Sequence, residues 1–95
     1  MLRITSHRRS NTVVFRLEGR LQGPWVDELS ACWRQTREAS SDAAFRIELA
    51  DVRFVDAAGK ALLTEMHRAG VEILATGVLT RAIRDEIVAG RGKGS

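Results

Sequence analysis

The stretch from Phe45 to Leu63, FRIELADVRFVDAAGKALL, decides the fold of this chain of 95 residues. Its first residues alternate between apolar and polar, with Phe45, Ile47 and Leu49 on one side, which predicts a strand. A short connection then leads through residues 54–59, and a helical spacing of apolar residues begins at once. This connection offers one carboxylate, two alanines and a glycine. It therefore indicates a surface that another protein reads, rather than a catalytic site.

Length and composition predict one small cytoplasmic domain. A content of 44% hydrophobic and 28% charged residues is that of an ordinary globular protein, and 95 residues allow one moderate core. We expect the domain to span residues 1–90 and residues 91–95 to form a flexible tail. No apolar run approaches the about 20 residues that span a membrane. The first residues also lack the apolar core of a signal peptide.

Apolar periodicity predicts four strands and three helices. Two strands, near residues 2–5 and 13–18, should form a hairpin around a polar turn at His7–Asn11, and Gly19 ends the second strand. A helix begins at Gly23-Pro24, because proline suits the first turn of a helix. This helix runs to near Glu38. The later elements are a strand at 45–49, a helix between Asp56 and Gly70, a strand at 71–76, and a helix that Thr80 caps and Gly90 ends.

The order β-β-α-β-α-β-α determines the architecture. A helix between two strands of one sheet makes a right-handed crossover and leaves those strands parallel, whereas the initial hairpin is antiparallel. The strands alternate between apolar and polar residues, so one face of the sheet should contact water. We therefore predict an α/β fold with a small mixed four-stranded sheet and with its helices mainly on one face.

Large apolar residues at helical spacing form the predicted core. Trp25 and Trp33 are interpreted as core anchors rather than as a ligand site. Cys32 lies on the same helical face, where it is interpreted as a small buried hydrophobe. The helix after Asp56 is expected to bury one face that consists of Ala58, Leu62, Met66 and Ala69.

Residues that carry catalysis or bind metals are not grouped in this sequence. His7 and His67 lie in different predicted elements, and neither has a partner at metal-ligand spacing. There is no Walker-type phosphate loop and no nucleophile elbow. The net charge is +3, but the arginines are scattered and do not alternate with aromatic residues, which argues against nucleic-acid binding. We expect no enzyme activity, no cofactor and no metal.

The order of elements and three short motifs resemble the STAS domain family, which includes the anti-sigma-factor antagonists. The family's second strand runs into a Gly-acidic-Leu-Asp pattern, which here reads Glu18-Gly19-Arg20-Leu21-Gln22. Its third strand ends in an apolar-Asp-Ser-Ser-Gly loop, which here is Phe54-Val55-Asp56-Ala57-Ala58-Gly59. The segment from His67 to Ile73 fits the family's pattern of a helix end, a glycine and an apolar strand. The similarity covers nearly the whole chain.

The resemblance implies a domain that is not phosphorylated at the usual loop position. In switching members of the family, a partner kinase that is also the anti-sigma factor phosphorylates the serine after the loop aspartate. The phosphate then disrupts the interface through its charge and its desolvation. That serine corresponds to Ala57, which has no hydroxyl, and the next position is Ala58. Gln22 replaces a carboxylate of the family, and Lys60 replaces an apolar residue.

The loop residues have both a functional and a structural interpretation. The resemblance implies that they form a surface for docking a partner. Asp56 is also placed to cap the following helix, and Gly59 permits close packing. The first N–H groups of that helix are a weak signal for an anion or nucleotide. The predicted partner-binding residues are Asp56, Ala57, Ala58, Gly59, Lys60, Leu21, Gln22 and Trp25.

The resemblance leaves three functions open. The first is binding to a kinase-fold anti-sigma factor or to a larger signalling assembly. The second is the role of an accessory subunit on the ATPase of an ABC-type lipid transporter. The third is a sensor of a small ligand or nucleotide at the loop. A homodimer through the exposed sheet face or through a strand edge is a further expectation.

Overall fold

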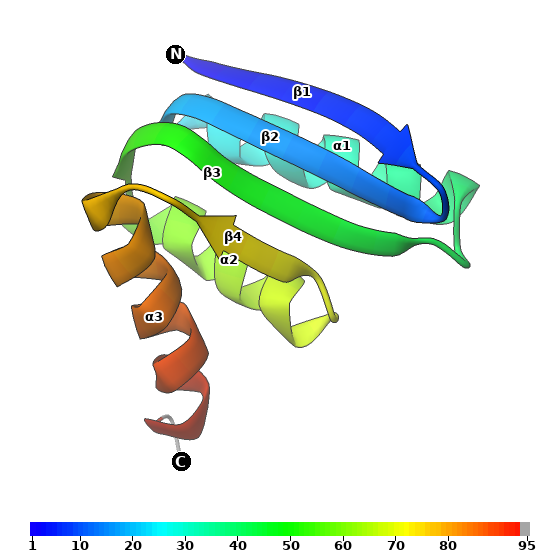
Figure 1. Cartoon of the computed structure of the whole chain (residues 1–95). Helices are drawn as coiled ribbons and strands as arrows, with labels where there is room; N and C mark the ends of the chain where they lie inside the picture. Colours follow the sequence, from blue (N-terminus) through cyan, green and yellow to red (C-terminus); the bar gives the residue numbers. More distant parts are fainter. Residues whose placement is uncertain (94–95) are drawn as a thin grey trace.

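The computed structural model describes residues 1–93 and confirms the predicted order of elements (Figure 1). The sheet order is β1-β2-β3-β4. The first pair of strands is antiparallel, and the other two pairs are parallel. The predicted tail at 91–95 lies partly outside the described residues. The elements are β1 (Leu2–Arg9), β2 (Thr12–Leu21), α1 (Pro24–Ala39), β3 (Ala44–Val55), α2 (Ala57–Arg68), β4 (Glu72–Ala75) and α3 (Val78–Lys93).

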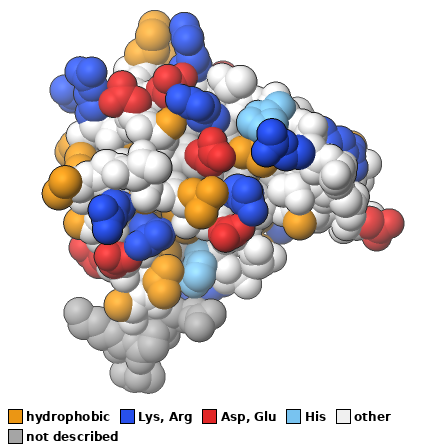
Figure 2. Space-filling view, in the orientation of Figure 1, with side chains coloured by type: hydrophobic (Ala, Val, Ile, Leu, Met, Phe, Trp, Pro, Cys, Tyr) orange, Lys and Arg blue, Asp and Glu red, His pale blue; other side chains and the backbone are white. Residues whose placement is uncertain are grey.

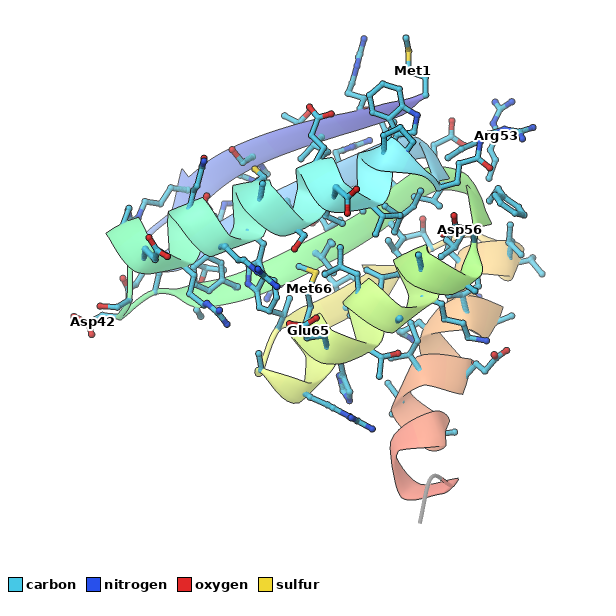
Figure 3. The ribbon with its side chains drawn as sticks, turned by 180° about the vertical axis from the view of Figure 1, so that it is seen from behind. Met1, Asp42, Arg53, Asp56, Glu65 and Met66 are labelled. Atoms are coloured by element: carbon cyan, nitrogen blue, oxygen red, sulfur yellow. The ribbon has the colours of Figure 1, made fainter. Side chains whose placement is uncertain are left out.

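Helices α1 and α2 cover one face of the sheet, as predicted (Figures 1 and 3). Helix α3 starts beyond β4 and packs against β4 and α2. Within residues 1–93, no helix covers the opposite face of the sheet (Figure 1). In a space-filling view, that face shows basic, acidic and apolar side chains mixed together (Figure 2).

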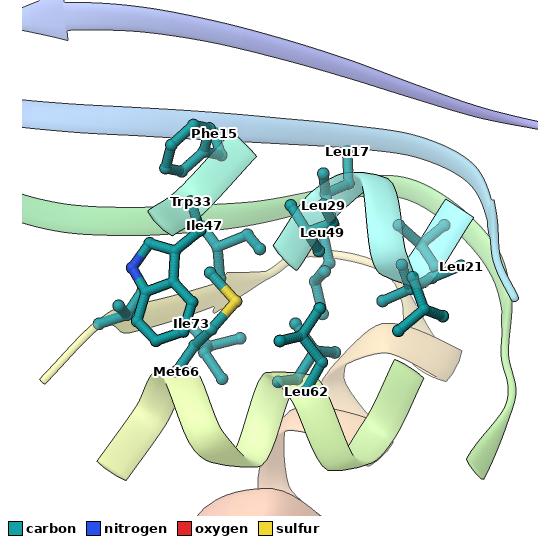
Figure 4. Packing of buried hydrophobic residues seen from close by; sticks show 14 of the residues in the cluster. Phe15, Leu17, Leu21, Leu29, Trp33, Ile47, Leu49, Leu62, Met66 and Ile73 are labelled. Carbon is teal, nitrogen blue, oxygen red and sulfur yellow. The ribbon is translucent and has the colours of Figure 1, made fainter. Parts of the chain in front are cut away.

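The core lies between the sheet and its two covering helices (Figure 4). Trp33 is 1% exposed, which confirms its interpretation as a core anchor, and the Arg37 guanidinium stacks on its ring at 4.4 Å. Trp25 and Cys32 are only partly buried at the edge of this core. Burial and the nearby charge of Glu28 raise the pKa of the Cys32 thiol. Other fully buried core residues are Phe15, Leu17, Leu21, Leu29, Ile47, Leu49, Leu63 and Met66.

The hairpin of β1 and β2 is longer than the pattern of apolar and polar residues predicted. The expected turn at His7–Asn11 is wrong, because β1 continues to Arg9, which pairs with Thr12. Only Ser10 and Asn11 turn the chain, and Ser10 has a φ of 54°. Polar side chains do not interrupt this pairing, because backbone groups form the ladder and an edge strand can leave its side chains in water.

Gly19 lies inside β2 instead of ending it. Its φ is +111°, and a Cβ at this position would lie 2.3 Å from the Met1 carbonyl oxygen. The register between β2 and β3 shifts on both sides of Gly19. This irregularity lets the strand continue to Leu21, which pairs with Val55. Strand β3 likewise continues past Leu49 to Val55, so the predicted connection shrinks to Asp56.

Helix α2 buries only part of the predicted face, in which Leu62 and Met66 are buried as expected. Ala58 and Ala69 are exposed, and the buried residues are Gly59, Leu62, Leu63 and Met66. The helix ends at Arg68 with Ala69 as its C-cap, and Gly70, which was predicted to close the helix, follows with a φ of +98°. Its N–H donates to the His67 carbonyl, and the Val71 N–H donates to the Met66 carbonyl, both at 3.0 Å. This is the Schellman pattern of a helix C-terminus.

Helix α3 departs from its prediction at both ends. Thr80 lies inside the helix rather than before it, and its Oγ1 accepts a bond from the Gly77 N–H at 3.0 Å. Thr80 therefore reaches back to the cap, as the third residue of a capping box does. The helix also continues past Gly90 to Lys93.

Candidate functional site

Asp56 holds the starts of two helices together. It is the N-cap of α2, where its Oδ1 accepts a hydrogen bond from the Gly59 N–H at 2.7 Å. Its Oδ2 accepts a second bond from the N–H of Gly23, the residue before α1, at 3.0 Å. These backbone donors, Gly23 first, lower the pKa of Asp56 from its ordinary value. The prediction that Asp56 caps the helix is confirmed, and the second bond is an addition to it.

Backbone contacts around Asp56 bring the ends of β2 and β3 against α2. The Asp56 N–H donates to the Leu21 carbonyl at 3.1 Å. A Cβ on Gly59 would lie 2.8 Å from that same carbonyl oxygen and 3.0 Å from Val55 Cγ1. Only a residue without a side chain permits this approach, so the predicted packing role of Gly59 is confirmed.

The predicted partner-binding residues meet at one end of the sheet, but they differ in exposure. Leu21 is 0% exposed and Gly59 is buried, so these two residues support the surface rather than form it. Ala57 and Ala58 are exposed. The other four are half-buried, namely Asp56, Lys60, Gln22 and Trp25. The surface that another protein can reach is therefore small, and it combines apolar with polar and charged side chains.

Lys60 does not project freely beside the loop. Its ammonium group forms an ion pair with Glu86 of α3. The Lys60 side chain is 41% exposed and the Glu86 side chain is 60% exposed, so this pair adds little to the stability of the fold. The pair nevertheless directs the cation away from Asp56 and toward α3.

Exposed apolar side chains at this same end were not among the predicted site residues. Phe54 is 43% exposed at the end of β3, and Val78 and Leu79 are 89% and 47% exposed at the start of α3. The end of β3 and the start of α3 lie at one edge of the molecule (Figure 1). A sequence signal could have found Val78, since it falls outside the helical spacing of Ile83 and Ile87, whereas Leu79 continues that spacing.

The described residues show no arrangement for bond chemistry at this end. Among them, no three His, Cys, Asp or Glu side chains come together as a metal site would require. His7 lies on β1 and His67 lies in the last turn of α2. No helix within residues 1–93 combines the length and the apolar character of a membrane span.

The fold is that of the anti-sigma factor antagonists. A crystal structure of an anti-sigma factor antagonist from Mycobacterium paratuberculosis matches with a TM-score of 0.78 and 18% identity, over 99% of this chain and 82% of its own. An uncharacterized protein from Shewanella loihica with a SpoIIAA-like fold matches with a TM-score of 0.58 and 12% identity, over 82% and 69%. No protein-family profile and no curated protein matches the sequence. The predicted STAS-like domain is thus confirmed at the level of the fold.

Proposed function

We propose that this chain is a non-catalytic module that binds a protein partner at the N-terminal end of α2, in the manner of an anti-sigma factor antagonist in the cytoplasm. One observation supports this most. Phe54, which precedes the N-cap of α2 by two residues, and Val78, which begins α3 at the same edge of the molecule, are both exposed (Figure 1). Exposed apolar groups that lie together are typical of interaction sites.

Rigidity also favours a docking role for this end. One carboxylate fixes the segments before both α1 and α2 through its bonds to Gly23 and Gly59. A surface that is already ordered loses less conformational entropy when a partner binds. The geometry therefore suits recognition of a partner by a fixed shape.

The first turns of α2 offer no hydroxyl for regulation. Ala57 and Ala58 occupy the first two positions, and Thr64 is the first hydroxyl residue of the helix. Thr64 is half-buried, and its Oγ1 donates to the Lys60 carbonyl at 2.8 Å. In this proposal the module binds its partner without a phosphate switch at the start of α2.

The test is capture of partners from the native lysate by the tagged wild type and by Ala57→Asp. An aspartate in the first turn is favoured by the helix dipole, so this change adds charge to the surface without weakening the helix. Capture should fall about tenfold or more, which corresponds to roughly 1.4 kcal/mol. Ala31→Asp is the matched control, because Ala31 is an exposed residue of α1.

The identity of the captured protein separates the two candidate pathways. A small kinase-fold ATPase would place the module with sigma factors, and a transporter ATPase would make it an accessory subunit of that transporter. Equal capture by the wild type and by Ala57→Asp would contradict docking at the start of α2.

A further inference from the structure

The surface has a shallow hollow of about 350 Å³ next to Gly19. It lies where the register between β2 and β3 shifts, near the ends of these two strands. Its charged lining comes from three neighbouring strands, because β1, β2 and β3 run side by side here. The charged lining residues are Arg3, Glu18, Arg20, Asp51 and Arg53.

Cations outnumber anions in this hollow. Arg53 Nη2 lies 3.8 Å from Asp51 Oδ2, and Arg3 is the register partner of Glu18 on the neighbouring strand. The Arg53 and Asp51 side chains are mostly exposed, at 75% and 65%, so water weakens the pair. Among the side chains that the structure describes, no carboxylate lies within 4.0 Å of a guanidinium nitrogen of Arg3 or Arg20.

The hollow lies next to the proposed docking surface in the sheet. Arg20 is the register partner of Phe54, the exposed aromatic residue of that surface. Met1, Arg53 and Asp56 lie at the same end of the molecule (Figure 3). Arginine and aromatic residues are enriched at the centres of protein interfaces. A guanidinium without an internal partner is also suited to bind a carboxylate through two parallel bonds.

We infer that Arg20 and Arg53 bind carboxylates of an acidic segment of the protein partner, and that Phe54 contacts an apolar residue of the same segment. This inference rests on the proposed function and adds the chemistry of the partner to it. The net charge of +3 favours the approach of such a segment.

The inference is tested by titrating the full chain, observed by amide NMR, with the end-blocked peptide Glu-Glu-Leu-Glu-Glu-Leu. Binding should shift amides at residues 19–21 and 51–54. The double variant Arg20→Gln/Arg53→Gln should bind about tenfold more weakly, because a bond to a charged group is lost at each position. Arg9→Gln/Arg68→Gln is the matched control, since it removes the same charge from two exposed arginines elsewhere.

The inference would be overturned if the peptide did not bind at concentrations up to about 1 mM, or if its binding shifted the amides of other residues. An equal loss of affinity in the control variant, or equal binding of a peptide with lysine in place of glutamate, would also overturn it. Displacement of the peptide by an equal concentration of inorganic phosphate would also overturn it, because the site would then select phosphate groups.

Failure of this inference can be distinguished from failure of the proposed function. If Ala57→Asp abolishes capture of a partner and Arg20→Gln/Arg53→Gln does not, docking at α2 stands and the acidic segment is wrong. If the peptide binds at the two arginines but no captured protein depends on Ala57, the acidic-segment site stands and docking at α2 is wrong.

Discussion

Replacing Gly59 by alanine should destabilise the domain, although the same replacement stabilises most helices. At an exposed helical site, alanine is favoured over glycine by roughly 1 kcal/mol. At position 59, however, the new Cβ would lie 2.8 Å from the Leu21 carbonyl oxygen, whereas ordinary contacts begin at 3.4 Å. The first turn of α2 must therefore move by about 0.6 Å away from β2.

This movement has a cost that exceeds the gain in helix propensity. Overpacking of a tight contact typically costs about 1–3 kcal/mol. It would also stretch the 2.7 Å bond from the Gly59 N–H to Asp56. After the propensity gain is subtracted, we expect the free energy of unfolding to fall by up to about 2 kcal/mol.

The assay is urea unfolding followed by circular dichroism, with the midpoint as the readout at an unchanged slope. Ala61→Gly serves as the control, because Ala61 is exposed on the same helix and measures the local propensity difference alone. A Gly59→Ala variant more stable than the wild type would refute the close-packing argument.

Three further predictions follow from the loop, the hairpin and the α2–α3 contact. Folding lowers the pKa of Asp56, so its charge stabilises the fold at a pH above the pKa of the unfolded state, which is about 4. This contribution is lost as the pH falls through the lower pKa of the folded state. The stability gap between the wild type and Asp56→Ala, measured by urea unfolding, should therefore narrow in acid; an equal gap at pH 3 and pH 7 would contradict the role of the charge. Ser10→Gly should raise the free energy of unfolding by about 0.5–1 kcal/mol, because Ser10 has a positive φ of 54°. A melting temperature that stays level or falls would argue against that strain, with Ser41→Gly as the control. A double-mutant cycle on Lys60 and Glu86 should give a coupling energy below about 1 kcal/mol, and a larger value would show that the pair is not a surface pair.

The fold class could be predicted because burial leaves a periodic pattern in the sequence. Phe45, Ile47 and Leu49 alternate as a one-sided sheet requires, and Pro24 suits the start of α1. The strand ends could not be predicted in this way. Pairing of the polar segment His7–Arg9 depends on backbone hydrogen bonds to β2, and the continuation past Gly19 depends on space beside Met1.

The site was predictable where a residue type has a local role. An aspartate before a helix and a glycine in its first turn indicate a cap and a close contact, and the structure has both at Asp56 and Gly59. The contacts that complete the site join distant segments. The second bond of Asp56 reaches Gly23, and the ion pair of Lys60 reaches Glu86. No local sequence pattern predicts such contacts.

The double attachment of Asp56 has a consequence for recognition of the folded state. Gly23 and Asp56 are 33 positions apart, and their bond joins the two segments that follow the paired ends of β2 and β3. A chain in which these two segments are not joined thus lacks the shape of the proposed docking surface. A partner that binds this end would select native molecules, and its binding would serve as a check on folding as well as a signal.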